Sequence, residues 1–298
     1  MRCAPKLATS TPISAFGLDD FEARTGSATS IIRTITGLYL RHRRAPIPRT
    51  HVVELATAAG ISTAAAQTAI SRLIDKQVLE NGTDSALRVP QMAQAMFERG
   101  SRRIFTPRQM SAMDPWCLVA YSLPETLRPL RHQIRKHFLQ LGGGLVAAGL
   151  WIFPEYLREE VDAALEALHA RAQATIFTVQ QPHFPATARE AAAQWWDLEQ
   201  LGSRHQQFLE ATAGLSADQA DPAEAYRGYV GMIDAWRALP YLDPGLPDGM
   251  LPEAWPGKRS RQRFLALSSA LRHPAQQFAA SVLGHGLKPD RFILPVGR

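Results

Sequence analysis

The residues on either side of Gly60 constrain the fold of this chain more than any other stretch. Segment 50–60 places apolar side chains at helical spacing behind Thr50, which can cap its start, and Gly60 can adopt the positive φ angle that ends a helix. Ser62 can cap a second helix. The apolar residues of this second helix recur at intervals of three and four, at Ala66, Ala69, Ile70, Leu73 and Ile74. The pattern predicts two helices joined by a tight turn, the arrangement of a helix-turn-helix.

The opposite face of the second helix carries short polar side chains, which leave room for approach to the base edges of DNA. Taken alone, such a face is more often simply solvated. The charge distribution and the neighbouring elements have to decide between a solvated face and a face that contacts DNA. We expect the following residues of this helix to contact DNA: Ser62, Thr63, Ala64, Gln67, Thr68, Ser71 and Arg72.

The positive charge of the chain is confined to the same region. Residues 28–107 contain 11 Lys or Arg and five Asp or Glu, whereas the rest of the chain is balanced, so this region accounts for the whole net charge of +6. A localised basic surface attracts a polyanion by releasing its condensed counterions, although charge alone is equally consistent with a solvated face. The arginines expected to hold DNA phosphates lie in a proline-containing loop and beyond it: Arg41, Arg43, Arg44, Arg49 and Arg88.

Neighbouring segments extend this region into a unit of three helices and a hairpin. A first helix begins at Ala28, with Ser27 or Ser30 as its cap. After the two helices around the glycine turn, the pair Asn81-Gly82 lies between two short apolar segments and favours a β-hairpin. This order predicts a winged helix-turn-helix over residues 28–106, which ends in a helix opened by a proline.

The period of the apolar pattern changes after this unit and predicts two further domains. Residues 114–181 contain a strand, a helix, one or two strands, a helix and a strand, an order that fits a ferredoxin-like βαββαβ domain. Residues 187–298 predict a helical C-terminal domain, interrupted by PYLDPGLPDGMLPEAWPGK, whose five prolines predict an ordered wrap or a lid. The expected fold class is α+β, with residues 1–27 as an N-terminal extension.

Several other classes of protein are disfavoured. No apolar run reaches the roughly 18–20 residues that span a bilayer, and the start of the chain lacks the apolar segment of a secretory signal, so we expect a cytoplasmic protein without a membrane partner. Cys3 and Cys117 each stand alone, and His132 and His137 miss the spacing of a metal-binding pair. The sequence also lacks a Walker loop and a G-x-S-x-G elbow. We therefore expect no enzyme activity, no metal and no cofactor.

Motifs from about residue 30 to about residue 283 resemble a known family, the phenylacetic acid degradation repressors, or PaaX-type transcriptional regulators. They are GISTAAAQTAISRLIDKQVLE, ERGSRRIFTP, WCLVAYSLPE, GLVAAGLWIFP, WWDLEQL and LDPGLPDGMLPEAWPG, of which the last is the most specific. The resemblance implies a homodimeric repressor that binds palindromic operators of double-stranded DNA upstream of aromatic catabolic genes. It also implies release from DNA when an aromatic acyl-CoA, typically phenylacetyl-CoA, binds.

The chain departs from the family pattern at the expected reading surface. Gln67 stands where family members usually carry arginine, and the hairpin contains Asp84 and a single cation, Arg88, where the family has a basic wing. Because glutamine pairs best with adenine and arginine with guanine, we expect a changed operator sequence. Small CRISPR-associated nucleases resemble the middle domain, but this chain has Ser122 where they place a metal-binding aspartate.

An effector pocket is expected between the middle and C-terminal domains. The residues expected to line it are Arg103, Trp116, Arg131, Arg135, Lys136 and Trp195. Binding there is expected to favour a dimer whose two reading heads no longer match the half-site spacing. The alternative interpretation is an architectural DNA-binding protein without a small-molecule effector.

Overall fold

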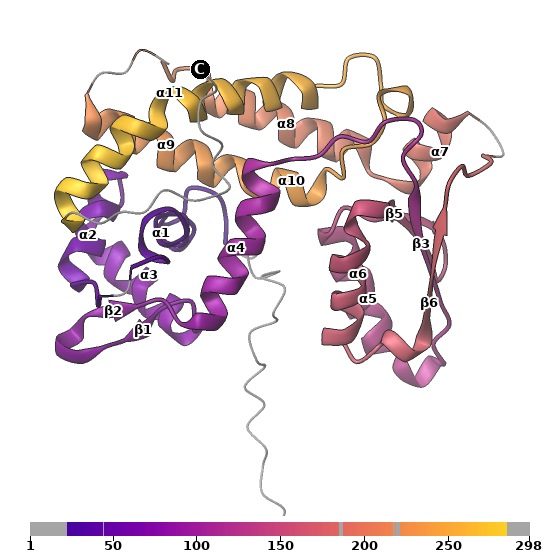
Figure 1. Cartoon of the computed structure of the whole chain (residues 1–298), viewed down its shortest axis with the longest axis horizontal. Coiled ribbons are helices and arrows are strands. Elements are labelled where there is room, and N and C mark those ends of the chain that lie inside the picture. Colours follow the sequence, from indigo (N-terminus) through magenta and orange to yellow (C-terminus); the bar gives the residue numbers. More distant parts are fainter. Residues whose placement is uncertain (1–22, 44, 185–186, 217, 219–220, 285–298) are drawn as a thin grey trace, which may run out of the picture.

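The computed structural model describes residues 23–43, 45–184, 187–216, 218 and 221–284, and it shows an α+β protein with two antiparallel sheets (Figure 1). The helices that precede residue 106 lie at one end, the larger sheet lies at the other, and the C-terminal helices run along both (Figure 1). The mixed fold class predicted from the sequence is confirmed. Most of the expected N-terminal extension lies outside the described residues.

Among its described residues, the N-terminal region contains four α-helices and a short hairpin. They are α1 (Ala28–Ile35), α2 (Arg49–Ala58), α3 (Thr63–Asp75), β1 (Glu80–Asn81), β2 (Leu87–Arg88) and α4 (Gln91–Phe105). Ser27 caps α1, because its Oγ accepts a hydrogen bond from the Ser30 amide at 3.3 Å. A π-helical turn (Thr36–Leu40) continues α1, which the sequence pattern did not predict.

Two local predictions for this region are wrong. Helix α2 begins at Arg49 with Pro48 in the capping position, so Thr50 lies inside the first turn and does not cap it. The hairpin reverses through Thr83–Ser85 rather than through Asn81-Gly82, because Asn81 is still paired with Leu87 in the ladder. The hairpin itself is present as predicted.

A third segment pairs with the hairpin. The amide of Ile47 donates to Leu87 O at 2.8 Å, and the amide of Leu87 donates to Ile47 O at 2.7 Å. Ile47 lies between Pro46 and Pro48, which have no amide hydrogen to donate, so the pairing is limited to this one bridge. The bridge ties the loop before α2 to the hairpin.

The middle of the chain forms the larger sheet. Its elements are β3 (Trp116–Tyr121), α5 (Arg128–Gln140), β4 (Gly144–Ala147), β5 (Leu150–Pro154), α6 (Arg158–Ala167) and β6 (Ala174–Val179). The strand order is β4-β5-β3-β6, and each neighbouring pair is antiparallel. Cys117 and Val119 pack on the face covered by α5 and α6, whereas Trp116 and Ile152 pack on the other face against Trp196.

The remaining helices are α7 (Ala188–Trp195), α8 (Leu198–Thr212), α9 (Pro222–Trp236), α10 (Leu239–Leu242) and α11 (Gly257–Leu283). The chain bends between α7 and α8, where Trp196 adopts an extended conformation. The proline-rich passage is ordered and lies along the segment that follows α4: the Met110 amide donates to Gly245 O at 2.8 Å, and the Gln109 side chain donates to Leu246 O. Of the two interpretations offered for this passage, the ordered wrap is the one observed.

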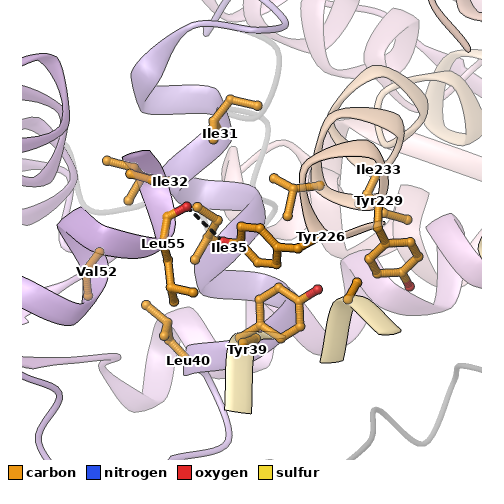
Figure 2. Close-up of a cluster of buried hydrophobic side chains, with 14 of the residues drawn as sticks. Ile31, Ile32, Ile35, Tyr39, Leu40, Val52, Leu55, Tyr226, Tyr229 and Ile233 are labelled. Carbon is orange, nitrogen blue, oxygen red and sulfur yellow. Dashed lines mark hydrogen bonds between the residues drawn. The ribbon is translucent and has the colours of Figure 1, made fainter. Parts of the chain in front are cut away.

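The N-terminal and C-terminal helices share one hydrophobic core. Side chains of α1 and α2 pack against Tyr226, Tyr229 and Ile233 of α9, as Figure 2 shows. The hydroxyl of Tyr226 donates to the backbone oxygen of Leu55 at 3.1 Å. Segments that the sequence assigned to separate domains, 28–106 and 187–298, are therefore joined through a continuous core.

A buried polar cluster fastens the start of α1 to α9. The Asp234 carboxylate accepts hydrogen bonds from the Gly26 amide at 2.7 Å, Ser30 Oγ at 2.5 Å and Thr34 Oγ1 at 2.9 Å. Arg237 Nε donates to the same carboxylate at 3.2 Å. Because charge-assisted hydrogen bonds are stronger than neutral ones, this cluster holds α1 firmly against α9.

Candidate nucleic-acid interface

The turn between α2 and α3 sets the direction of α3. Gly60 adopts a φ of +92°, in the region that favours glycine, and the Ile61 amide closes the turn by donating to Ala56 O at 3.0 Å. Ser62 caps α3 as predicted, because its Oγ accepts from the Ala65 amide at 3.4 Å. The residues buried beneath α3 are Ala66, Ala69, Ile70 and Leu73. Their position fixes which side of α3 faces solvent.

The outward side of α3 forms an exposed ridge. Its predicted contact residues are all exposed: Ser62, Thr63, Ala64, Gln67, Thr68, Ser71 and Arg72. Thr68 Oγ1 donates to Ala64 O at 3.0 Å and Ser71 Oγ donates to Gln67 O at 3.2 Å, so each hydroxyl oxygen keeps acceptor capacity toward solvent. The side-chain amide of Gln67 makes no hydrogen bond with any described residue. Both its NH2 donor and its oxygen acceptor are therefore available to a base.

Two grooves flank this ridge. The first has a volume of about 840 Å³ and lies between the start of α1 and α3, where Arg24, Ser27, Thr68 and Arg72 line it. The second has a volume of about 800 Å³ and lies between the start of α2, the ridge and the hairpin. Its lining includes Arg49, Thr50, Thr63, Gln67 and Asp84. The ridge of α3 therefore projects between two hollows on one side of the protein.

The two grooves differ in charge. The first contains Arg24, Arg72 and Lys76 with one carboxylate, Asp75. The second contains Arg49 with two carboxylates, Glu54 and Asp84, and Arg49 Nη2 donates to Asn81 Oδ1 of the hairpin at 3.2 Å. A polyanion is therefore attracted more strongly to the groove beside α1.

Arg24 was not among the predicted contacts. Residues 1–27 have no net charge, because acidic residues balance the cations, so the charge distribution along the sequence did not indicate Arg24 as a contact. Only the fold reveals that Arg24 and Ser27 lie beside Arg72 in one groove.

The arginine loop does not have the predicted form. Arg41 is 1% exposed and its Nε donates to His42 Nε2 at 2.9 Å, so the prediction that it contacts phosphate at the surface is wrong. The physical reason is the π-helical turn, which the Arg41 amide closes by donating to Thr36 O at 3.0 Å and which directs the side chain inward. Arg43 is half-buried, Arg44 lies outside the described residues, and Arg88 is exposed on the hairpin.

The structure does not bring the predicted effector residues together. Trp116 is 4% exposed and packs against Trp196 with ring centroids 6.3 Å apart, on the sheet face opposite α5. Arg131 lies on α5 and donates to Leu123 O at 3.1 Å, whereas Arg135 and Lys136 are exposed on the same helix. The prediction of one pocket from these residues is therefore wrong, because the sheet separates the tryptophan from the cations.

The two other residues predicted for that pocket have structural contacts. Arg103 Nη1 pairs with Glu160 at 3.3 Å, its Nη2 donates to Tyr241 O at 3.2 Å, and its guanidinium lies 5.0 Å from the Tyr241 ring centroid. Arg103 thus joins α4, α6 and α10. Trp195 is half-buried between Phe184 and Trp196, with ring centroids at 5.7 and 6.1 Å.

The described residues hold neither a metal-binding cluster nor a helix that could cross a membrane. No group of three or more His, Cys, Asp or Glu in that part of the chain could hold a metal ion. Cys117 is buried, and burial raises the pKa of its thiol to about 12. Among the helices that the structure describes, none is both long and apolar enough to cross a membrane.

Comparison with known proteins identifies the family. Residues 110–191 match the PaaX protein central Cas2-like domain, and residues 196–281 match the PaaX-like protein C-terminal domain, so the two matches span more than half of the chain. The transcriptional repressor PaaX of Escherichia coli (strain K12) is 24% identical over 266 residues, which cover 85% of this chain and 83% of that protein. The structure also resembles that of the uncharacterized protein Rv0674 from Mycobacterium tuberculosis, with a TM-score of 0.55 and 21% identity over 84% of this chain and 98% of the other. The chain belongs to the PaaX-type family.

Proposed function

We propose that this protein is a DNA-binding transcriptional repressor, that residues 28–106 form its winged helix-turn-helix, and that α3 enters the major groove of its operator. The exposed ridge of α3 between two grooves is the observation that carries the proposal. The major groove of B-DNA is about 12 Å wide and admits one α-helix, and its two phosphate strands then meet the hollows on either side of that helix.

The contacts divide into two kinds. Gln67, Thr68 and Ser71 stand on the ridge and meet base edges, with Gln67 suited to the N6 and N7 atoms of adenine. Arg24 and Arg72 hold one phosphate strand, and Arg49 with Arg88 on the hairpin hold the other. The phosphate contacts supply affinity, whereas the ridge supplies sequence preference.

Family membership extends the proposal to assembly and regulation. The name of the Escherichia coli relative supports repression, and the strand order β4-β5-β3-β6 supports a ferredoxin-like middle domain over residues 114–181. We include in the proposal a homodimer, a palindromic operator and an aromatic effector, such as an aryl acyl-CoA, that releases the DNA. A two-fold dimer places two copies of α3 on successive half-sites.

Fluorescence anisotropy with the DNA upstream of the protein's own gene, at several salt concentrations, tests the DNA-binding part. We expect Gln67→Ala to reduce discrimination between this DNA and a scrambled duplex by about 5- to 150-fold, which corresponds to about 1–3 kcal/mol. Arg72→Ala should instead weaken binding to both duplexes and reduce the slope of log K against log salt by about 1.

Arg259→Ala is the matched control, since Arg259 is an exposed arginine at the start of α11 and lines neither groove. It should leave both affinity and salt slope unchanged. Equal binding of the wild-type protein to the upstream and scrambled duplexes would contradict a repressor that reads sequence and would favour an architectural DNA-binding protein.

A further inference from the structure

The tip of the β1–β2 hairpin carries a carboxylate and no cation. Residues 83–86 form the tip, and Asp84 is the charged residue among them. The cation of the hairpin, Arg88, lies at the opposite end of the ladder, where it pairs with Glu80. The hairpin therefore presents a negative charge to whatever its tip contacts.

The tip has a defined backbone conformation. Asp84 and Ser85 have φ angles of +56° and +59°, and the Ala86 amide donates to Thr83 O at 3.0 Å. Positive φ at both central residues is typical of a type I′ turn, in which Asn-Gly is the favoured pair. Non-glycine residues that hold such angles are frequent at functional sites. The turn fixes the direction in which the Asp84 side chain leaves the hairpin.

The hairpin is also fixed relative to α2 and α3. The amides of Ile47 and Leu87 donate to each other's backbone oxygens at 2.8 and 2.7 Å, and Leu87 is fully buried. Arg49 Nη2, at the start of α2, donates to Asn81 Oδ1 at 3.2 Å. The Asp84 carboxylate is therefore held at a set place beside the ridge of α3.

Asp84 lines the same groove as the ridge residues Thr63 and Gln67. Its carboxylate is exposed and makes no hydrogen bond or ion pair with any described residue. An ionised carboxylate accepts hydrogen bonds and donates none. One hollow therefore contains a pure acceptor, on Asp84, and the mixed donor and acceptor of the Gln67 amide.

The chemistry of DNA decides what such an acceptor can contact. A phosphate is repelled by the carboxylate, because both carry negative charge. In the major groove, cytosine presents the N4 amino group as a donor, whereas the amino group of adenine lies beside the acceptor N7. A carboxylate therefore suits cytosine best.

We propose that Asp84 is a specificity-determining residue, which accepts a hydrogen bond from cytosine N4 in a base pair near the one that Gln67 contacts. Its charge also weakens binding to every duplex that places a phosphate there instead. This inference rests on the proposed function, because it requires α3 to lie in the major groove.

Asp84→Asn tests the role of the carboxylate without changing the shape of the hairpin. Asparagine adopts positive φ angles as readily as aspartate does, so the turn should be retained. Its amide has a donor and an acceptor, the pattern that matches adenine. Glu54→Gln removes a second exposed carboxylate from the same groove, on α2, and Glu253→Gln removes one that lines neither groove.

Fluorescence anisotropy on a scrambled duplex, at one low salt concentration, measures the repulsion. We expect Asp84→Asn to strengthen binding roughly fivefold, since two unit charges about 4 Å apart in water repel each other by an energy equivalent to that factor. Glu54→Gln should also strengthen binding, and Glu253→Gln should change it by less than twofold. Unchanged affinity in Asp84→Asn would overturn the repulsion.

Selection of bound duplexes from a randomised library, followed by sequencing, measures the base preference. The wild type should prefer cytosine at one position of the half-site, by about 5- to 150-fold, close to the adenine that Gln67→Ala no longer selects. Asp84→Asn should change that position from cytosine to adenine, whereas Glu54→Gln and Glu253→Gln should keep cytosine.

Three outcomes of the selection would contradict the inference, and they differ in what else they refute. If Asp84→Asn selects the same base as the wild type at every position, Asp84 does not read a base, and the proposed function is unaffected. If Glu54→Gln changes the same position as Asp84→Asn, the effect belongs to the charge of the groove and not to Asp84. If the wild type selects no sequence at all, the proposed function fails and this inference fails with it.

Discussion

We expect truncation of Asp234 to destabilise this protein strongly. The Asp234 side chain is 1% exposed and accepts hydrogen bonds from the Gly26 amide, Ser30 Oγ, Thr34 Oγ1 and Arg237 Nε. In Asp234→Ala these donors lose their acceptor, and the Arg237 side chain, 8% exposed, loses its bond to this carboxylate. Removal of one partner from a buried ion pair costs about 3–5 kcal/mol, because the other charge stays buried. The free energy of unfolding should fall by that amount.

Urea denaturation followed by tryptophan fluorescence gives this free energy. Since 1 kcal/mol shifts the Tm of a domain of this size by about 2–4 °C, a loss of about 3–5 kcal/mol should lower the thermal midpoint by about 6–20 °C. Glu253→Ala removes an exposed carboxylate and should change stability by less than about 0.5 kcal/mol.

A double-mutant cycle tests the reason for the loss. If the cost comes from burying the Arg237 charge without the Asp234 carboxylate, Arg237→Met in the Asp234→Ala background should recover at least about 1 kcal/mol. A loss of less than about 1 kcal/mol in the single variant, or a double variant that is no more stable than the single one, would refute the reasoning.

Three further predictions concern packing, backbone conformation and a thiol. Gly144→Ala places a Cβ 2.6 Å from the Trp196 ring and should cost about 1–3 kcal/mol in urea denaturation, whereas Gly249→Ala, whose Cβ would meet no atom within 4 Å, is the control. Gly60→Ala forces alanine to a φ of +92° and should cost about 1–2 kcal/mol, with a matching loss of DNA affinity if α3 is misdirected; an unchanged stability would count against the strained turn. In a Cys3→Ser variant, Cys117 should resist a thiol reagent at pH 8 until urea is added, because burial raises its pKa to about 12 and leaves about one thiolate in ten thousand. Because this pKa is raised from 9.0, the associated stability is present below about pH 9 and is lost as the pH rises toward 12, so the stability advantage over Cys117→Ala should shrink in that range.

Periodicity predicted the elements that bury one face and expose the other. Helix α3 is the clearest case, since Ala66, Ala69, Ile70 and Leu73 alternate with polar positions at a spacing that only a helix brings onto one side. Ser62 as its cap was equally predictable, because a short hydroxyl side chain before such a run satisfies an exposed amide. Helical periodicity and N-capping depend on residues that are close together in the sequence, so the sequence alone predicts them.

Features that depend on distant contacts could not be predicted in this way. Arg41 belongs to a run of arginines that looks exposed, and its burial follows from the π-helical turn that packs Tyr39 and Leu40 into the core. Trp116 and the cations of α5 lie close in sequence, but the sequence does not say which face of the sheet α5 covers. Arg24 joins the α3 groove only because Asp234, more than 200 residues away, holds the start of α1.

The contacts made by α9 differ in strength. The bonds of Asp234 to α1 are buried, and each is a hydrogen bond to a charged group worth about 1.5–3 kcal/mol, so together they exceed any single bond of that kind. Tyr226 is buried as well, and its bond to Leu55 O lies inside the shared core. The exposed bond from Arg227 to Ala58 O is a single hydrogen bond from a charged group, worth about 1.5–3 kcal/mol at most. A perturbation that breaks only the bond from Arg227 should therefore leave α1 and α9 packed together.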